Sequence, residues 1–189
     1  EIVGVKKDGS PSKSKNTASW KEQAAAARAA GQTPLSPSEA ARVNLMARLL
    51  DEQLRSDPEI GRNPFAERAN NELAMLWRDG PVWCRAKPDA IDYENRIVWD
   101  LKTTDALADP TSWTDTQIRA TSIDLRAAHY LHGTSRLIGP GWRYLFVVAE
   151  ARRPHAISVV ELPGIYLETG EDKRQRAVSW WGRCLTAGE

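Results

Sequence analysis

Strand-like and helix-like segments alternate along this chain in an order that allows few folds. Up to about residue 57 the apolar residues recur at helical spacing, and from residue 72 they gather in short, β-branched and aromatic runs between turn residues. Strands are predicted over 72–77, 82–86, 97–99, 142–149 and 156–162, and helices over 19–30, 36–56, 110–137 with a break near 121–122, and 165–185 with an interruption at Gly170. The order of helices, three strands, a helix, two strands and a final helix predicts an α/β fold.

Short turn and cap signals set the ends of several elements. Asp79-Gly80 favours a hairpin between the first two strands, although the segment 70–77 taken alone is also compatible with a helix. Residues 19–22 and 36–39 both have the Ser-x-x-Glu spacing of a capping box. Each of these two segments is therefore expected to begin a helix.

Composition and charge narrow the class of protein. The chain has 26 Lys and Arg against 25 Asp and Glu, a net charge of +1, so any nucleic-acid site must be local. No apolar run approaches the roughly 20 residues that a membrane helix needs. The two isolated cysteines, Cys84 and Cys184, fit neither a disulfide framework nor a metal motif. We therefore expect a protein of the reducing cytoplasm with no membrane partner.

The length, 189 residues, suits one domain with a terminal extension. Residues 1–35 combine a basic arm with an Ala-rich helix, and the arm is interpreted as solvated. Residues 36–189 would form the main domain. Because the chain begins with Glu1 instead of Met, we expect it to be a segment of a longer protein.

Two acids and a lysine would converge if residues 90–99 form a hairpin. Pro88-Asp89 precedes this stretch, and Asp100-Leu101-Lys102 follows the apolar residues 97–99. Side chains alternate along a strand, so Asp100 and Lys102 should point to the same face. Two carboxylates suit Mg²⁺ or Mn²⁺, and an ammonium beside them would position a water or stabilise developing charge. The alternative interpretation is a structural ion pair at the end of a strand.

Four short segments carry a family resemblance. They are 72–77 (ELAMLW), 84–89 (CRAKPD), 98–104 (VWDLKTT) and 126–130 (RAAHY), with Gly133 beyond the last of them. Together they resemble the RecE-type, exonuclease VIII-like branch of the PD-(D/E)XK nuclease superfamily. The resemblance extends over about residues 17–189 and is strongest between 72 and 133.

The resemblance implies a fold and a set of roles. The fold would be a PD-(D/E)XK nuclease core, with a central mixed β-sheet flanked by helices and an N-terminal helical extension. Asp89, Asp100 and the backbone carbonyl of Leu101 would hold Mg²⁺ (or Mn²⁺), and Lys102 would orient or help to deprotonate the attacking water. Glu72 is implied as a further acid of the catalytic site, on the first strand.

The activity implied by the resemblance is metal-dependent hydrolysis of DNA. The family's enzymes are 5′ to 3′ exonucleases that degrade double-stranded DNA in phage and prophage recombination. They pass single strands to a RecT-type annealing protein, and they assemble as homo-oligomeric rings. Two alternatives stay open: an endonuclease or repair nuclease on the same core, and a non-catalytic or incomplete DNA-binding or assembly module.

Four residues are candidates for contacts with DNA: Arg85, Lys87, Arg126 and Tyr130. Arg126 stands where the family usually has a glutamine, and a guanidinium can hold a phosphate through two hydrogen bonds. Arg85 and Lys87 alternate with apolar residues on the strand that leads to Asp89, where a phosphate contact and a solvated edge fit equally well. Tyr130 could contact DNA, brace the lysine or simply pack.

The histidines are not expected to bind metal. Related proteins have a metal-ligating histidine upstream, whereas this sequence has none before His129. His129 and His132 lie three residues apart on a predicted helix, but no acid or cysteine stands at a supporting spacing. We interpret His129 as packed and His132 as a surface residue.

Overall fold

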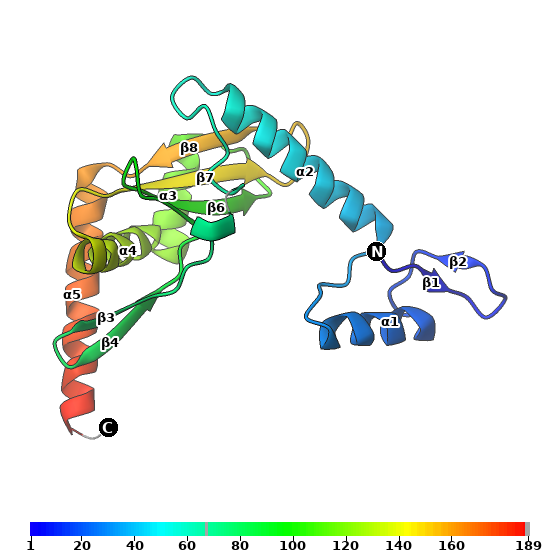
Figure 1. Ribbon diagram of the computed structural model, residues 1–189, viewed down its shortest axis with the longest axis horizontal. Coiled ribbons are helices and arrows are strands. Elements are labelled where there is room, and N and C mark those ends of the chain that lie inside the picture. Colours follow the sequence, from blue (N-terminus) through cyan, green and yellow to red (C-terminus); the bar gives the residue numbers. More distant parts are fainter. Residues whose placement is uncertain (67, 188–189) are drawn as a thin grey trace. The chain divides into compact units, whose positions relative to one another are not determined.

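The chain folds into two compact units, Glu1–Glu52 and Gln53–Glu189. The computed structural model describes residues 1–66 and 68–187 (Figure 1). The sequence suggested a boundary before residue 36, just ahead of helix α2 (Pro37–Ser56), whereas the contacts divide the chain inside that helix. The last turn of α2 belongs to the second unit because Leu54 is almost fully buried there.

The first unit contains structure in the segment that was expected to be a solvated basic arm. Strands β1 (Gly4–Val5) and β2 (Pro11–Ser12) form a two-stranded antiparallel sheet. Ile2, just before β1, packs against Trp20 of helix α1 (Ala18–Ala29). One apolar contact therefore anchors an otherwise basic segment.

The cap signals in the sequence predicted the start of α2 correctly and the start of α1 incorrectly. Helix α1 begins after Thr17, whose hydroxyl accepts a hydrogen bond from the Trp20 N–H at 3.2 Å, so the predicted cap at Ser19 is wrong. Helix α2 begins as predicted. The Ser36 N–H donates to the Glu39 carboxylate at 3.0 Å, and the Glu39 N–H donates to Ser36 Oγ at 3.4 Å, which is a reciprocal capping box.

A four-stranded mixed sheet forms the centre of the second unit. Its strands lie side by side in the order β5 (Ala90–Asp92), β6 (Ile97–Thr104), β7 (Arg143–Glu150) and β8 (Ile157–Glu161) (Figure 1). β6 is antiparallel to β5 and parallel to β7, and β7 is antiparallel to β8. A parallel pair needs a crossover connection. Helices α3 (Pro110–Thr121) and α4 (Ile123–Ile138) supply it.

Helices α3 and α4 share the main hydrophobic core with one face of this sheet. Phe146 of β7 is fully buried in a cluster with Trp113 of α3 and Ala127 of α4. The rings of Trp113 and Phe146 lie 5.3 Å apart. Ser122, with a φ of 51°, separates the two helices where a break was predicted. A central mixed β-sheet flanked by helices is the predicted fold class, which is confirmed.

The first two predicted strands form a separate hairpin outside the central sheet. β3 (Met75–Asp79) and β4 (Val82–Ala86) pair on either side of Gly80, whose φ of 60° suits the turn. The first strand begins later than predicted because Glu72 has a φ of 56°, which a strand does not allow. A short 3₁₀ helix, η1 (Arg68–Asn70), precedes it.

Helix α5 (Gly164–Ala187) continues through Gly170, so the predicted interruption there is wrong. A Cβ atom at Gly170 would lie 2.2 Å from the carbonyl oxygen of Asp124 in α4. This glycine therefore lets the two helices cross closely. Beyond the crossing, α5 runs alongside the hairpin formed by β3 and β4 (Figure 1).

The helices and the two cysteines bear on the expectations drawn from composition. Within residues 1–66 and 68–187, none of the helices is both long and apolar enough to cross a bilayer. Cys84 is a buried free thiol, and Cys184 is a partly exposed one.

Candidate active site

The pairing of β5 with β6 brings Asp89 next to Asp100. Asp89 directly precedes β5, and Ala90 pairs with Trp99, so the two acids meet at the same level of the sheet. The N–H of Leu101 donates a hydrogen bond to Asp89 Oδ2 at 2.6 Å. The convergence predicted from the spacing is therefore present, and a backbone hydrogen bond holds the Asp89 carboxylate in place.

Lys102 and Arg126 supply positive charge on either side of the Asp100 carboxylate. The side chain of Asp100 is only 5% exposed. Lys102 Nζ donates a hydrogen bond to Asp100 Oδ1, as their shared face of β6 predicts, and it lies 3.3 Å from the Leu101 carbonyl oxygen. Arg126, from α4, places Nη1 3.8 Å from Asp100 Oδ2. Arg126 thus places a cation that faces the Asp100 carboxylate.

The Asp89 carboxylate is in an environment that opposes its ionisation. Burial is the main cause that raises the pKa of Asp89, to about 6, and the adjacent Asp100 carboxylate adds to this effect. The hydrogen bond from the Leu101 N–H and the charge of Lys102 act in the opposite direction. Two carboxylates crowded together in a half-buried site favour the binding of either a proton or a metal cation between them.

The two carboxylates fit a divalent metal ion. Asp100 Oδ2 is buried and has no hydrogen-bond partner among the described residues. Within that same part of the chain, no three His, Cys, Asp or Glu side chains cluster as a metal site. The family resemblance would make Asp89, Asp100 and the carbonyl of Leu101 the protein ligands, and this set stays a prediction. Mg²⁺ and Mn²⁺ accept such an incomplete oxygen set because they retain bound water.

Tyr144 of β7 lies on the same face as Asp100, and the sequence analysis missed it. Its side chain is buried, and burial together with the nearby Asp100 charge raises the pKa of the Tyr144 phenol well above its ordinary value. In the register of the sheet, Tyr144 pairs with Val98 in β6. The only sequence signal was a tyrosine within an apolar strand, and that strand's position beside β6 was not predictable from spacing.

Tyr130 packs between the sheet and the residues after β4. Its ring lies 5.8 Å from the ring of Tyr144 in an edge-on arrangement, and its hydroxyl lies 3.5 Å from the Lys87 carbonyl oxygen. It therefore contributes to the wall of the site, as the packing interpretation proposed. A contact of Tyr130 with DNA stays a prediction.

Glu72 does not join the two aspartates. Its N–H donates to the Asp89 carbonyl at 3.2 Å, so its backbone lies beside the site, but its side chain is more than half exposed and forms an ion pair with Lys87. Glu72 also precedes β3 and is not on the strand where the resemblance placed it. Its role as a catalytic acid stays a prediction, and its present contact is with a lysine.

The basic candidates on the hairpin lie at the edge of the site. Arg85 and Lys87 have exposed side chains. Their backbone carbonyls accept contacts from α4, where His129 Nε2 is 3.1 Å from the Arg85 carbonyl oxygen. Of the two basic side chains, Lys87 is close enough to Asp89 for that charge to act on it, and it is paired with Glu72. Contacts of Arg85 and Lys87 with phosphate stay a prediction.

Both histidines of α4 pack against the hairpin. The ring of His129 lies 4.8 Å from the ring of Trp77, and burial lowers the pKa of His129. His132 is half-buried, 3.4 Å from Asp79 Oδ2, so its interpretation as a surface residue is wrong. The hairpin covers it because Trp77 lies against Gly133, where a Cβ atom would come within 2.6 Å of the indole ring.

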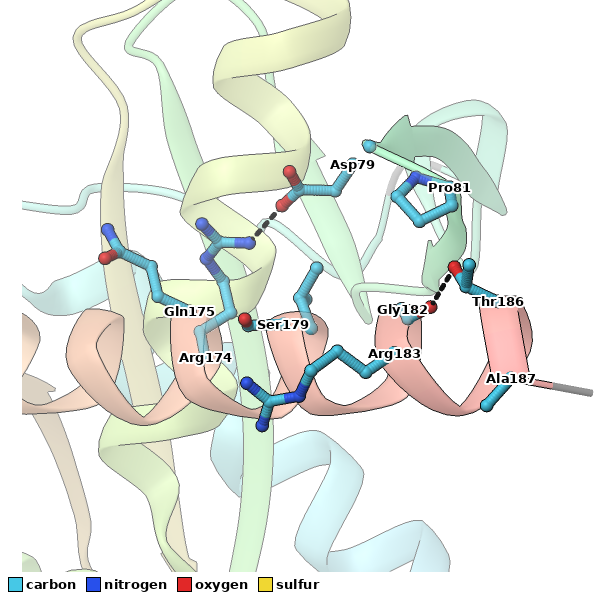
Figure 2. A pocket seen from close by; sticks show the side chains of 11 residues that line it. Asp79, Pro81, Arg174, Gln175, Ser179, Gly182, Arg183, Thr186 and Ala187 are labelled. Atoms are coloured by element: carbon cyan, nitrogen blue, oxygen red, sulfur yellow. Dashed lines mark hydrogen bonds and ion pairs between the residues drawn. The ribbon is translucent and has the colours of Figure 1, made fainter. Parts of the chain in front are cut away.

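A separate open hollow of about 680 Å³ lies between the β3–β4 turn and α5. Figure 2 shows Arg174 at its inner wall, joined by an ion pair to Asp79. Arg174 also forms two 2.7 Å hydrogen bonds with Glu171. Among the described residues that line the hollow, none belongs to the candidate active site. The paired charges act structurally, because they fasten α5 to the hairpin.

Comparisons with known proteins find similarity in the fold and none in the sequence families. No family model and no curated protein sequence matches the chain. The chain is similar to the crystal structure of a "Putative exonuclease" from Eubacterium rectale, with a TM-score of 0.57 and 14% identity over 90% of this chain and 63% of that one. It is also similar to a phage related exonuclease from Haemophilus somnus, with a TM-score of 0.45 and 8% identity over 98% and 92% of the two chains.

The similarity at this level of identity concerns the fold. The chain shares the fold of the Eubacterium rectale protein, with a mixed sheet whose inner strand β6 carries the acid-x-lysine pair. It spans 63% of the length of the Eubacterium rectale protein. Activity, substrate and partners therefore belong to the proposal that follows.

Proposed function

We propose that this protein is a Mg²⁺- or Mn²⁺-dependent deoxyribonuclease that hydrolyses double-stranded DNA from its ends, most consistent with a 5′ to 3′ exonuclease of phage or prophage recombination. One observation carries the proposal: Asp89, Asp100 and Lys102 converge on a sheet of nuclease fold. A simple ion pair at a strand end does not explain why Asp89 is held beside Asp100 at the cost of a raised pKa. A metal site does explain it, because a cation would relieve the repulsion.

Each residue of the site has a task that follows from its contacts. Asp89, Asp100 and the Leu101 carbonyl would hold the metal ion, which when bound supplies Lewis acidity that stabilises negative charge on a phosphate oxygen. Lys102 Nζ is anchored by Asp100 Oδ1. An ammonium has three N–H groups, so Lys102 can still donate to the attacking water or to a phosphate oxygen. The buried face of Tyr144 limits water on the inner side of the carboxylates.

Arg126 is proposed to bind the phosphate of the substrate. Its side chain is 45% exposed, and its distance of 3.8 Å from Asp100 exceeds that of a hydrogen bond. The guanidinium can therefore turn toward a phosphate oxygen while the carboxylate binds the metal ion. Arg85 and Lys87, at the neighbouring edge, would add weaker contacts with the DNA backbone.

The proposed partners follow from the proposed activity. The substrate is double-stranded DNA, and the single strands that remain would be bound by an annealing protein of the RecT type. We also propose a homo-oligomeric ring, in which the duplex passes to one active site at a time. Sedimentation of the protein, alone and with an annealing protein, tests both assembly proposals directly.

A linear duplex labelled at either 5′ end or either 3′ end tests the activity. We expect Mg²⁺ or Mn²⁺ to support release of nucleotides and a chelator to stop it. Release that begins with the 5′ label supports 5′ to 3′ polarity. Cleavage of a closed circular plasmid would instead favour an endonuclease, and metal-independent binding without any cleavage would favour a DNA-binding module.

Substitutions of Asp100 and Lys102 test whether cleavage takes place at this site. We expect Lys102→Ala to lower the rate by about 10²- to 10⁴-fold, the usual range for a group that acts on a proton in the transition state. Asp100→Asn should remove cleavage and weaken metal binding. Asp105→Asn is the matched control for the acid, because Asp105 is 77% exposed and lies just beyond β6. Near-normal cleavage by Lys102→Ala would contradict the assigned role of the lysine.

A further inference from the structure

A second depression adjoins the candidate active site, between helices α4 and α5. It has a volume of about 480 Å³. Leu125 and Tyr130 contribute to it from α4, and Val178 and Trp181 from α5. This groove adjoins the hollow in Figure 2, which lies at the β3–β4 turn, and the two share Arg174 and Val178 in their walls.

The groove has an aromatic and apolar lining that is open to solvent. Trp181 leaves 57% of its surface exposed, which is unusual for the largest apolar side chain. Tyr130 and Leu125 line it from the opposite helix, and Val178 lines it from α5. Its polar lining includes Arg126, His129 and Arg174. A slot of this kind suits a flat aromatic group, because an exposed indole offers a face for stacking.

Arg126 connects the groove to the carboxylates. It lines the groove and also lies 3.8 Å from Asp100 Oδ2. One guanidinium therefore borders both an apolar slot and a candidate phosphodiesterase centre. A ligand that has both an anionic group and an aromatic ring matches this arrangement, with the anionic group at Arg126 and the ring in the groove. A nucleotide within a strand has this combination of a phosphate and a planar base.

We propose that this groove binds an unpaired base of the DNA strand whose phosphate lies at Arg126, with the base stacked on Trp181. The inference rests on the proposed function, and it specifies that function further by requiring locally single-stranded substrate. A base within a duplex has both faces covered by its neighbours, so stacking on a side chain needs an unpaired base. The groove is of a size that holds a small molecule, whereas a stable protein partner needs an interface on the order of 1,000 Å² or more.

Fluorescence anisotropy with a 5′-labelled oligothymidylate tests the proposal. The full chain is used with a chelator present, so that binding is measured without hydrolysis. We expect Trp181→Ala to weaken binding of the single strand by about 5- to 100-fold, the usual effect of removing one stacking aromatic side chain. Trp181→Phe should retain most of the affinity, since phenylalanine also offers a flat face.

Trp180→Ala is the matched control. Trp180 is the neighbouring residue and is 67% exposed, but it borders a different depression with Arg183 and Cys184. We expect Trp180→Ala to bind like the wild type. Thermal unfolding of each variant verifies that it is folded, and because both tryptophans are exposed, neither substitution should lower stability by much.

The possible outcomes distinguish a failure of the groove proposal from a failure of the proposed function. If the wild type cleaves DNA and Trp181→Ala binds the oligothymidylate as tightly as the wild type, the proposal for the groove is wrong and the proposed function stands. A specific loss of affinity in Trp181→Ala would support the groove even if the protein cuts no DNA. Equal losses in the two tryptophan variants, a change in sedimentation without a change in affinity, or no binding of the oligonucleotide by the wild type would each overturn the proposal.

Discussion

Replacing Asp89 with asparagine should make the metal-free protein more stable at neutral pH. In the wild type, Asp89 must ionise in a half-buried site next to Asp100, and this raises its pKa to about 6. The unfolded chain releases the same proton near its ordinary value of 3.8. Asparagine has no charge, and its carbonyl oxygen can still accept the hydrogen bond that the Leu101 N–H gives to Asp89 at 2.6 Å. The substitution therefore removes the repulsion and keeps the backbone contact.

The sign and the size of this effect follow from proton linkage. Because the folded protein holds the proton more tightly, its stability falls as the pH rises from about 4 to about 6, and the full penalty remains above pH 6. A difference of about 2 pH units corresponds to about 3 kcal/mol at most. Solvent screening reduces this value because the carboxylate is only partly buried, so we expect a gain of about 1 kcal/mol for Asp89→Asn at pH 7.5.

Urea unfolding in the presence of a chelator measures this gain. Wild type and Asp89→Asn should have similar stability at pH 4, and the variant should be more stable at pH 7.5. Added Mg²⁺ or Mn²⁺ should stabilise the wild type and leave the variant nearly unchanged. Asp105→Asn controls for the general loss of a negative charge, since Asp105 is exposed. A wild type that is more stable than Asp89→Asn at pH 7.5 without metal would refute the argument.

Three further substitutions test the crossing of two helices, a charge beside the site and a helix cap. Gly170→Ala should lower the free energy of unfolding by about 2 kcal/mol or more, because its Cβ would meet the Asp124 carbonyl at 2.2 Å, whereas Gly164→Ala has open space and should be neutral or slightly stabilising in thermal unfolding. Arg126→Gln should weaken DNA binding and reduce its logarithmic salt slope by about one; an unchanged slope would speak against a phosphate contact. Ser36→Ala should destabilise α2 by about 1 kcal/mol, seen as reduced helical circular dichroism on heating, and an unaltered melting curve would show that the cap contributes little.

The order of elements and the pair on β6 were predictable because they depend on local pattern. Residues 97–99 form a short β-branched and aromatic run that predicts a strand, and because side chains alternate along any strand, Asp100 and Lys102 fall on one face. The spacing to Asp89 then requires only a short hairpin. The capping box at Ser36 is local in the same way, since all of its partners lie within four residues.

The features that were missed depend on contacts between distant parts of the chain. Gly170 was interpreted as a helix break because a glycine in isolation favours one, and only the neighbouring α4 shows that it serves a close crossing. Tyr144 reaches the site through the parallel pairing of β7 with β6, for which a sequence offers no register. The side chain of Glu72 turns to Lys87 because its backbone adopts a positive φ, which the apparent strand pattern concealed.

The parallel pairing of β6 with β7 also limits how this site could be transferred to another protein. Every predicted site residue lies between Glu72 and Tyr130, so one continuous segment of the chain contains them all. Yet β6 has β7 as its neighbour along its whole length, and the core side chain Phe146 comes from that later strand. A fragment ending with α4 would carry the predicted site residues with β6 open on the side that β7 normally covers, and such an exposed edge is prone to association with other chains. Transfer of the site to another protein would therefore have to include β7 as well as residues 72–130.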